Sequence, residues 1–224
     1  MITKNILICL IAMPCLVMAM DQSSIEPMQI DKAQNAIKLD LSSKQLTKLP
    51  AGLVELSNVI ALNVANNNLT SKAISKLWKI CPRLEELNLS FNQLTSLPVG
   101  LGVIKQSLNN INFDDPDVNM LRQMTIYYRG SGFCDGLANL IYLKKLNVSG
   151  NYLDFESIAR ICESCLDLEE LDLSHSELFM LPTSVKFLVR LRTLNLQGNR
   201  ITPENQEFIR QLIAKSAPQA TVLF

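Results

Sequence analysis

The sequence predicts an α/β solenoid, a curved horseshoe with a parallel β-sheet on its concave face and a mixed 3₁₀ and α-helical convex side. Three observations support this fold class. Residues 84–98 place leucines at a spacing that is neither helical nor strictly alternating. The same phrase recurs along the chain at a nearly constant interval. A helix and a short strand are expected after its last copy, where they would cap the stack.

Each position in residues 84–98 has a physical reason. Leu87 and Leu89 alternate on a short strand, so both face the core while Asn88 faces outward. Asn92 lies where the chain turns away from the strand, and its amide can hydrogen-bond backbone groups that the stack would otherwise leave unpaired. One such unit has a half-buried apolar face and cannot fold alone, so neighbouring units must cover it.

Seven units can be placed in register within residues 37–202. Their first strand positions are Leu39, Leu62, Leu87, Ile111, Leu146, Leu171 and Leu194. Successive positions are 23 to 25 residues apart except for one step of 35 residues, from Ile111 to Leu146. Lys44 replaces the turn asparagine in the first unit, and edge repeats are often atypical because they cap the stack.

The long step contains an insertion at residues 119–136. It is the one aromatic-rich irregular segment of the chain and includes Tyr127, Tyr128 and Arg129. The fourth unit, which precedes it, keeps the apolar skeleton but has Pro116 at the asparagine position. Its turn must therefore be built differently.

Two kinds of connection are expected on the convex side. Proline fixes an extended or 3₁₀-like path after the turn of some units. These units carry Leu-Pro at 49–50, 97–98 and 181–182. Longer units carry a helical apolar pattern, as in residues 74–81 and 158–165, and Asp154 is the expected N-cap of the second helix. Residues 203–224 predict a capping helix and a final strand over the open end.

The N-terminal residues predict export. Residues 1–19 combine one lysine, an apolar run at 6–18 and a small residue, Ala19, before the expected cleavage site, which is the pattern of a signal peptide. An N-terminal membrane anchor is the alternative, but the run contains Pro14 and is shorter than the ~18–20 residues that span a bilayer. We expect a leader or cap at 20–36, no stable membrane span after cleavage, and a secreted or periplasmic location.

The composition limits the class of partner. The 224 residues contain 48% hydrophobic residues, enough for one sizeable core. Lys and Arg number 21, as do Asp and Glu, so the chain has no basic excess of the kind that nucleic-acid binding requires. We expect a monomer whose partner is another protein.

Two cysteines form a C-x-x-C pair, Cys162 and Cys165, which could be a redox centre or half of a metal site. The repeat register offers a simpler interpretation. Cys165 and Cys81 each lie three residues before the first leucine of a unit, where other units have leucine, so core positions are expected. A disulfide between Cys134 and either Cys162 or Cys165 is the one pairing that the repeat spacing allows.

The only histidine, His175, would have to supply the base of any Ser-His-Asp arrangement. It falls with Asp172 and Ser174 in the strand and turn of one repeat, so a solvent-facing turn position is expected instead. The chain has no phosphate-binding loop, dinucleotide fingerprint or paired-histidine metal motif. The sequence therefore predicts no catalytic residue, no metal site and no cofactor.

The outward strand positions form the candidate binding surface, because they should line the concave face. The expected contact residues, taken from two neighbouring polar columns, are Asn63, Glu86, Asn88, Asn110, Asn112, Lys145, Asn147, Glu170, Asp172 and Asn195. A third column, with Ser90 and Ser149 among its members, is small and polar. The face lacks aromatic anchors, which Tyr127, Tyr128 and Arg129 would supply. Alternatively, the columns are simply solvated and the inserted aromatics pack the insertion down.

These repeats resemble the leucine-rich repeat superfamily over residues 37–224. The Leu-Pro units are similar to short repeats of bacterial and cytosolic members, and the cysteine-bearing units are similar to longer ribonuclease-inhibitor-like repeats. The cysteine-rich flanking caps of animal extracellular members are absent, which favours a bacterial origin. The resemblance implies a right-handed horseshoe and a protein-binding role, and it does not identify the partner.

Two functional hypotheses follow. The favoured one is an exported, non-catalytic protein that binds another protein through the concave face and the 119–136 insertion. The other is a secreted enzyme or thiol-redox protein that uses Cys134, Cys162 and Cys165, with His175 as a further candidate.

Overall fold

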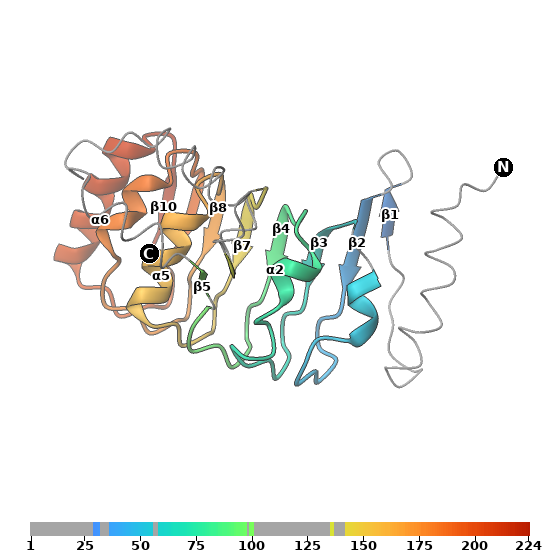
Figure 1. The fold of residues 1–224 in the computed structure, drawn as a ribbon. Coiled ribbons are helices and arrows are strands. Elements are labelled where there is room, and N and C mark those ends of the chain that lie inside the picture. The colour runs from blue at the N-terminus through green and yellow to red at the C-terminus, as the bar shows by residue number, and fades with distance from the viewer. Residues whose placement is uncertain (1–28, 32–35, 56–57, 98, 101–134, 137–141) are drawn as a thin grey trace.

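The structure is a computed structural model, and it describes residues 29–31, 36–55, 58–97, 99–100, 135–136 and 142–224. Its main element is a sheet of short strands that stand in a row with the helices on one side (Figure 1). In spatial order the strands are β1 (Gln29–Asp31), β2 (Ala36–Asp40), β3 (Val59–Asn63), β4 (Glu86–Asn88), β7 (Lys145–Asn147), β8 (Glu170–Asp172), β9 (Thr193–Asn195) and β10 (Thr221–Leu223). All neighbours from β2 to β10 pair in parallel, as the sequence predicts for a solenoid.

The leucines of the repeat phrase form one continuous core. Leu62 is the register partner of Leu87, and Leu87 is the partner of Leu146, with all three at most 2% exposed. The second leucine of the phrase, Leu89, is also buried, because alternate residues of a strand share a face. Each such side chain contributes about 1.5–3 kcal/mol through the removal of apolar surface from water.

The third unit is followed in space by the fifth unit. Leu87 in β4 pairs in register with Leu146 in β7, although 59 residues separate them in the sequence. The expectation that a strand around Ile111 lies between them is therefore wrong. The fourth unit itself, residues 108–118, lies outside the described residues.

The turn chemistry explains why the fifth unit follows the third. The backbone N–H of Leu94 donates to Oδ1 of Asn151 at 3.1 Å, and Nδ2 of Asn151 donates to the carbonyl of Leu89 at 3.0 Å. An asparagine in the next unit thus completes the turn of the third unit. The fourth unit has Pro116 at this position, and proline has no side-chain amide to make these bonds.

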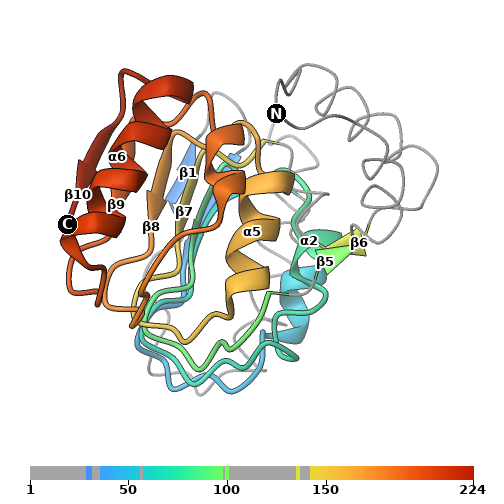
Figure 2. The same cartoon turned by 90° about the vertical axis from the view of Figure 1, so that its left-hand side faces the viewer.

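A second, two-stranded sheet lies where the chain leaves the third unit and returns to the fifth. β5 (Val99–Gly100) pairs antiparallel with β6 (Asp135–Gly136). β6 contacts α2 (Leu77–Ile80), and both strands lie on the helix side of the main sheet (Figure 2). The chain therefore leaves the described body at Gly100 and returns at Asp135 on the convex side.

Buried asparagines join the turns of neighbouring units, which stack along the lower edge in Figure 2. Nδ2 of Asn92 donates to the carbonyls of Val64 and Leu89, both at 3.0 Å. Its Oδ1 accepts from the N–H of Leu69 at 3.0 Å. The same role is taken by Asn67, Asn151 and Asn199. The predicted function of the turn asparagine is confirmed.

Two units build the turn without an asparagine. The first has Lys44 and the sixth has Ser176 at this position, and both place a residue with positive φ on either side of it. These flanking residues are Ser43, Gln45, His175 and Glu177, with φ between 52° and 56°. The next asparagine compensates, because Asn199 Oδ1 accepts from the N–H groups of both Ser176 and Leu178 at 3.0 Å.

The convex side mixes the two predicted connections. The 3₁₀ helices η1 (Ala51–Glu55) and η3 (Thr183–Phe187) each follow a Leu-Pro pair, and the longer units carry α2 and α5 (Phe155–Ser164). Asp154 caps α5 as expected, because its side chain accepts from the N–H of Ser157 at 2.8 Å.

The C-terminal cap agrees with the sequence prediction. α6 (Pro203–Ser216) begins after Thr202, and β10 adds to β9 with Val222 in register with Leu194. At the other end, β1 pairs antiparallel with β2 inside the segment expected as a leader. The sequence did not predict this strand. The expected signal peptide, residues 1–19, lies outside the described residues.

Candidate functional site: the concave face

The concave face forms an open hollow of about 860 Å³ that extends across the sheet from Lys38 to Leu223. Eight of the predicted contact residues line it: Asn63, Glu86, Asn88, Lys145, Asn147, Glu170, Asp172 and Asn195. The structure therefore brings these eight side chains to one surface. The other predicted contact residues, Asn110, Asn112, Tyr127, Tyr128 and Arg129, lie outside the described residues.

The asparagine and aspartate column of this face also stabilises the strand ends. Oδ1 of Asn88 accepts from the backbone N–H of Ser90 at 3.0 Å and from its hydroxyl at 2.7 Å. The same bond to the N–H two residues on is made by Asp40, Asn63, Asn147, Asp172 and Asn195. One oxygen of each side chain is thus committed to an Asx turn, and only the other polar atom can serve a ligand.

The small polar column is buried in the middle repeats of the molecule, while Ser42 is half-buried and Gln197 is exposed at its two ends. Ser90 is 4% exposed, Ser149 is 3% exposed and Ser174 is 6% exposed. The expectation that this column belongs to the open surface is wrong for Ser90, Ser149 and Ser174, where the Asx turn directs the chain inward after the strand and a further repeat lies on either side. In the middle repeats, the surface available to a partner is therefore two columns wide.

The free hydrogen-bond donors are concentrated at the centre of the hollow. Nδ2 of Asn63 donates to Asp40 Oδ2 at 3.1 Å, and Nδ2 of Asn195 donates to Asp172 Oδ2 at 3.2 Å. In the part of the chain that the structure describes, Nδ2 of Asn88 and of Asn147 has no such partner. These two amides face the hollow from the adjacent strands β4 and β7.

The carboxylate of Asp40 is held in its ionised form. Burial acts to raise its pKa, but hydrogen bonds from Ser42 and Asn63 and the charge of Lys44 outweigh this effect. The pKa of Asp40 is therefore lowered. The N-terminal part of the hollow carries a fixed negative charge beside the exposed Lys38.

Ion pairs join every neighbouring pair of strands from β4 to β9. They are Lys144–Glu85 at 2.8 Å, Lys145–Glu170 at 3.1 Å and Arg192–Glu169 at 3.2 Å. The pKa values of Lys144 and Lys145 are raised by the hydrogen bond and charge of their partners. These exposed pairs contribute little stability. Of the three pairs, Lys145–Glu170 lines the hollow, so a charged ligand bound there must compete with it.

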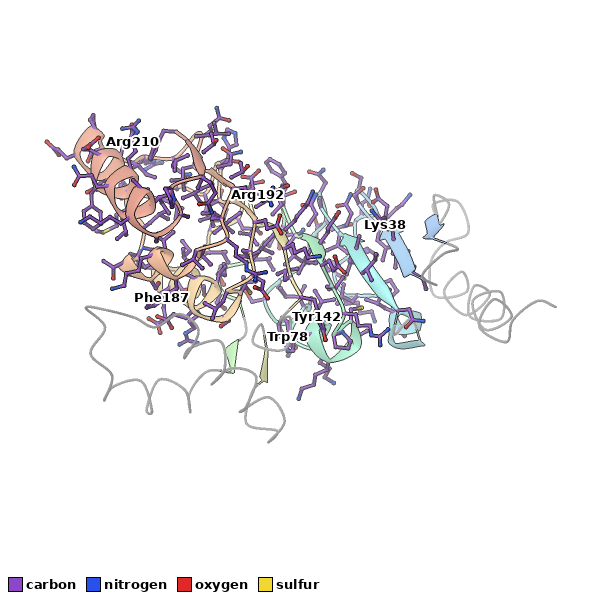
Figure 3. The ribbon with its side chains drawn as sticks, turned by 90° about the horizontal axis from the view of Figure 1, so that it is seen from above. Lys38, Trp78, Tyr142, Phe187, Arg192 and Arg210 are labelled. Carbon is purple, nitrogen blue, oxygen red and sulfur yellow. The ribbon has the colours of Figure 1, made fainter. Side chains whose placement is uncertain are left out.

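Four charged residues of the hollow, Lys38, Asp40, Glu86 and Asp172, have no ion-pair partner among the described residues. The two aspartates accept hydrogen bonds from Asn63 and Asn195, which leaves Lys38 and Glu86 as the groups without a described partner. Lys38 projects from the concave side, as Arg192 does, while Trp78 and Tyr142 lie on the opposite side (Figure 3). The charges open to a ligand thus lie toward the N-terminal half of the face.

The thiols occupy the core, as the repeat register predicted. Cys81, Cys162 and Cys165 are free cysteines and at most 1% exposed. Burial raises the pKa of Cys81 and of Cys165 to about 12, and it also raises the pKa of Cys162. A neutral buried thiol is a poor nucleophile, so this pair does not support redox chemistry. Cys134 lies outside the described residues.

The remaining candidate for chemistry, His175, is exposed in a turn with φ of 52°, which confirms its expected position.

No group of three or more His, Cys, Asp or Glu side chains in the described ranges could hold a metal ion. The described helices include none long and apolar enough to cross a membrane.

Comparisons with known proteins agree with the repeat geometry. The family model for the Leucine Rich Repeat matches residues 83–104 and 190–212. Lumican of Oryctolagus cuniculus is 31% identical over 148 residues, which cover 65% of this chain and 68% of that protein. The chain belongs to the leucine-rich repeat family.

Two further matches show how much of longer leucine-rich repeat proteins this chain covers. Lumican of Gallus gallus is 33% identical over 164 residues, and the match spans 73% of this chain but only 43% of lumican. The ectodomain of the Arabidopsis receptor kinase HAESA, solved with a peptide hormone ligand, is 21% identical with a TM-score of 0.56. That match covers 100% of this chain and 33% of the ectodomain, and it supports the leucine-rich repeat fold.

One part of the hollow was missed by sequence reasoning. Leu223 of β10 lines its C-terminal end and is 37% exposed. The signal was present, because the final strand was predicted and its register places Leu223 opposite Asn195. The capping strand of this leucine-rich repeat protein thus extends the concave face with an apolar residue.

Proposed function

We propose that this protein is an exported, non-catalytic interaction module that binds a protein partner through its concave face. The observation that carries the proposal is the centre of the hollow, where the carboxylate of Glu86 and Nδ2 of Asn88 and Asn147, on the adjacent strands β4 and β7, have no partner among the described residues. A partner with complementary donors and acceptors can use these groups without displacing an ion pair. Export rests on the signal-peptide pattern of residues 1–19.

The two ends of the hollow favour different partner groups. Lys38 and Asp40 leave charges at the N-terminal end, whereas Leu223 offers an apolar contact at the C-terminal end. The Lys145–Glu170 ion pair within the hollow disfavours a highly charged ligand at β7 and β8. The preferred partner is thus a mainly polar, uncharged segment with a charged end near β2.

The 119–136 insertion is proposed as a secondary contact. Its expected contact residues are Tyr127, Tyr128 and Arg129. β5 and β6 lie on the convex side, beside α2, so the chain leaves and re-enters the described body away from the hollow. The concave face is therefore proposed as the primary surface.

Site-specific photo-cross-linking tests the primary surface. Benzoylphenylalanine would replace Ala61 or Thr193 in the hollow and, as matched controls, Lys72 or Lys215, which are exposed and outside it. We expect the same partner adduct from both hollow positions in the organism's secreted or periplasmic fraction, and none from the controls. Adducts from the control positions alone would refute concave-face binding.

A charge reversal provides a second readout. Glu86→Lys places a cation at the one unpaired carboxylate of β4, beside Lys145, so we expect loss of the cross-linked adduct. Glu207→Lys, an equal change at an exposed site outside the hollow, should leave the adduct unchanged.

A further inference from the structure

Four large apolar side chains are exposed on consecutive turns of the fifth and sixth units. Tyr152 is 65% exposed, Phe155 51%, Phe179 60% and Met180 49%. We call these four residues the flank cluster. Single exposed apolar side chains are ordinary on protein surfaces, but a group of them marks an interaction site.

The backbone register places the two turns of the flank cluster side by side. Before the turns, the N–H of Gly150 donates to the carbonyl of Ser174 at 2.9 Å. After them, the hydroxyl of Ser184 donates to the carbonyl of Ala159 at 3.3 Å. Residues 152–155 and 178–180 therefore run as neighbours, about one strand spacing apart.

The seventh unit extends the flank cluster. Nδ2 of Asn205 donates to the carbonyl of Phe179 at 3.0 Å, and the guanidinium of Arg200 lies 5.9 Å from the centre of the Phe179 ring. These contacts fix the position of Phe179 while more than half of its surface stays open. A side chain held in place loses little entropy when a partner covers it.

The flank cluster is separate from the proposed concave site. None of its four residues lines the hollow. In the sequence they follow β7 and β8 and precede or begin the convex-side helices α5 and η3. A partner could therefore occupy the flank cluster while the concave face is filled.

The charges around the flank cluster are unbalanced. Glu156 pairs with Arg160 at 3.1 Å, and Glu177 pairs with Arg200 at 3.3 Å. The exposed carboxylates of Asp154 and Glu204 have no ion-pair partner among the described residues. The uncompensated charge at the rim is therefore negative.

We propose that the flank cluster is a second docking surface, for an amphipathic protein segment whose apolar residues are flanked by Lys or Arg. Tyr152, Phe155, Phe179 and Met180 supply an apolar and aromatic centre, and Asp154 and Glu204 supply complementary rim charges. An anionic membrane surface fits less well, because the same carboxylates repel it.

Two synthetic helical peptides with the same leucine positions test the proposal, one with lysine and one with glutamate at all other positions. We expect the leucine–lysine peptide to bind the full chain at least about tenfold more tightly than the leucine–glutamate peptide, measured by fluorescence anisotropy. Replacing both Tyr152 and Phe179 with serine should weaken its binding by about tenfold or more. Phe208→Ser, at an aromatic side chain 47% exposed on α6, is the matched control and should have no effect.

A second pair of substitutions tests the rim charges of Asp154 and Glu204. Asp154→Asn keeps the N-cap of α5, and combined with Glu204→Gln it should reduce the preference for the lysine peptide while circular dichroism stays unchanged. Equal binding of both peptides by the wild type, or unaltered binding by the serine variant, would overturn the proposal. So would cluster-dependent binding to phosphatidylcholine vesicles without binding to either peptide.

Discussion

A single amide side chain repeated along the chain determines how the units stack. Each turn asparagine donates to carbonyls of its own unit and of the unit before it, and it accepts a backbone N–H from the preceding turn. These backbone groups are buried and have no strand partner, so each lost bond leaves an unsatisfied group at a cost of about 1–3 kcal/mol. The asparagine is therefore both a turn residue and a connector between units.

Asn151→Ala tests this role between the third and fifth units. Asn151 is fully buried, and its amide bonds to the backbone of Leu89, Leu94 and Val148 at 3.0–3.1 Å. We expect the free energy of unfolding in urea to fall by about 3 kcal/mol. The matched control is Asn68→Ala, at an exposed asparagine, which should change it by less than about 0.5 kcal/mol. Equal effects of the two changes would contradict the connector role.

The glycine of the fifth turn is required by its neighbour as well as by its backbone. Gly150 has φ of 62°, and a Cβ added there would lie 2.5 Å from Cδ1 of Phe91. We expect Gly150→Ala to lower the free energy of unfolding by about 2–3 kcal/mol. In a Phe91→Ala background only the cost of positive φ remains, about 1 kcal/mol. A thermal-denaturation double-mutant cycle with no coupling would contradict the contact.

The buried thiols predict an alkaline loss of stability. Burial raises the pKa of Cys81 and Cys165 from 9.0 to about 12, so the folded chain keeps these protons when the unfolded chain loses them. The stabilisation is complete below pH 9 and is lost as the pH rises from 9 toward 12. At pH 10 the free energy of unfolding is therefore lower than at pH 8 by about 1 kcal/mol for each of these thiols. Urea titrations at both pH values, with Cys81→Ala as the comparison, measure this; an equal decline in the variant would contradict it.

At the level of elements, the repeat unit and the segment that interrupts it are structurally distinct. The described solenoid passes from β4 to β7 without a gap in register, while β5 and β6 pair with each other outside the main sheet. The pairing of Gly100 with Asp135 brings the two ends of residues 101–134 together. The solenoid should therefore not depend on this segment.

Replacing residues 101–134 with an Asn-Gly turn tests this independence. The turn would join β5 to β6 as a two-residue hairpin, which suits an antiparallel pair. We expect the shortened chain to keep its far-ultraviolet circular dichroism per repeat and to melt within a few degrees of the full chain. Loss of cooperative melting would show that the segment belongs to the core. If the concave cross-link persists in the shortened chain, Tyr127, Tyr128 and Arg129 are dispensable for binding.

For the whole molecule, the sequence predicted those structural features that are set by the residue pattern within a single repeat unit. The strand leucines, the buried cysteines, the cap of α5 by Asp154 and the closing strand β10 all follow from spacing within one unit. The hollow could be predicted for the same reason, because strand alternation decides which side chains face outward.

The sequence did not predict those structural features that are set by hydrogen bonds to the backbone, including the bonds between repeat units. The fourth unit matched the apolar phrase, yet Pro116 could not supply the amide that the third turn needs, and Asn151 of the fifth unit supplies it instead. The Asx turns that bury Ser90 and Ser149 likewise follow from a backbone hydrogen bond that apolar spacing does not encode. β1 escaped prediction because its three residues are too few to establish an alternating pattern.

The central structural claim is that the third unit stacks directly on the fifth, and a disulfide trap tests it most directly. Glu86 and Lys145 are register partners, whereas the seven-unit alignment of the sequence would place Asn110 beside Glu86. In a Cys134→Ser background, we predict that Glu86→Cys with Lys145→Cys forms an intramolecular disulfide under mild oxidation, detected by peptide mass mapping. Glu86→Cys with Asn110→Cys should not. Efficient cross-linking of positions 86 and 110, and none between 86 and 145, would contradict the claim.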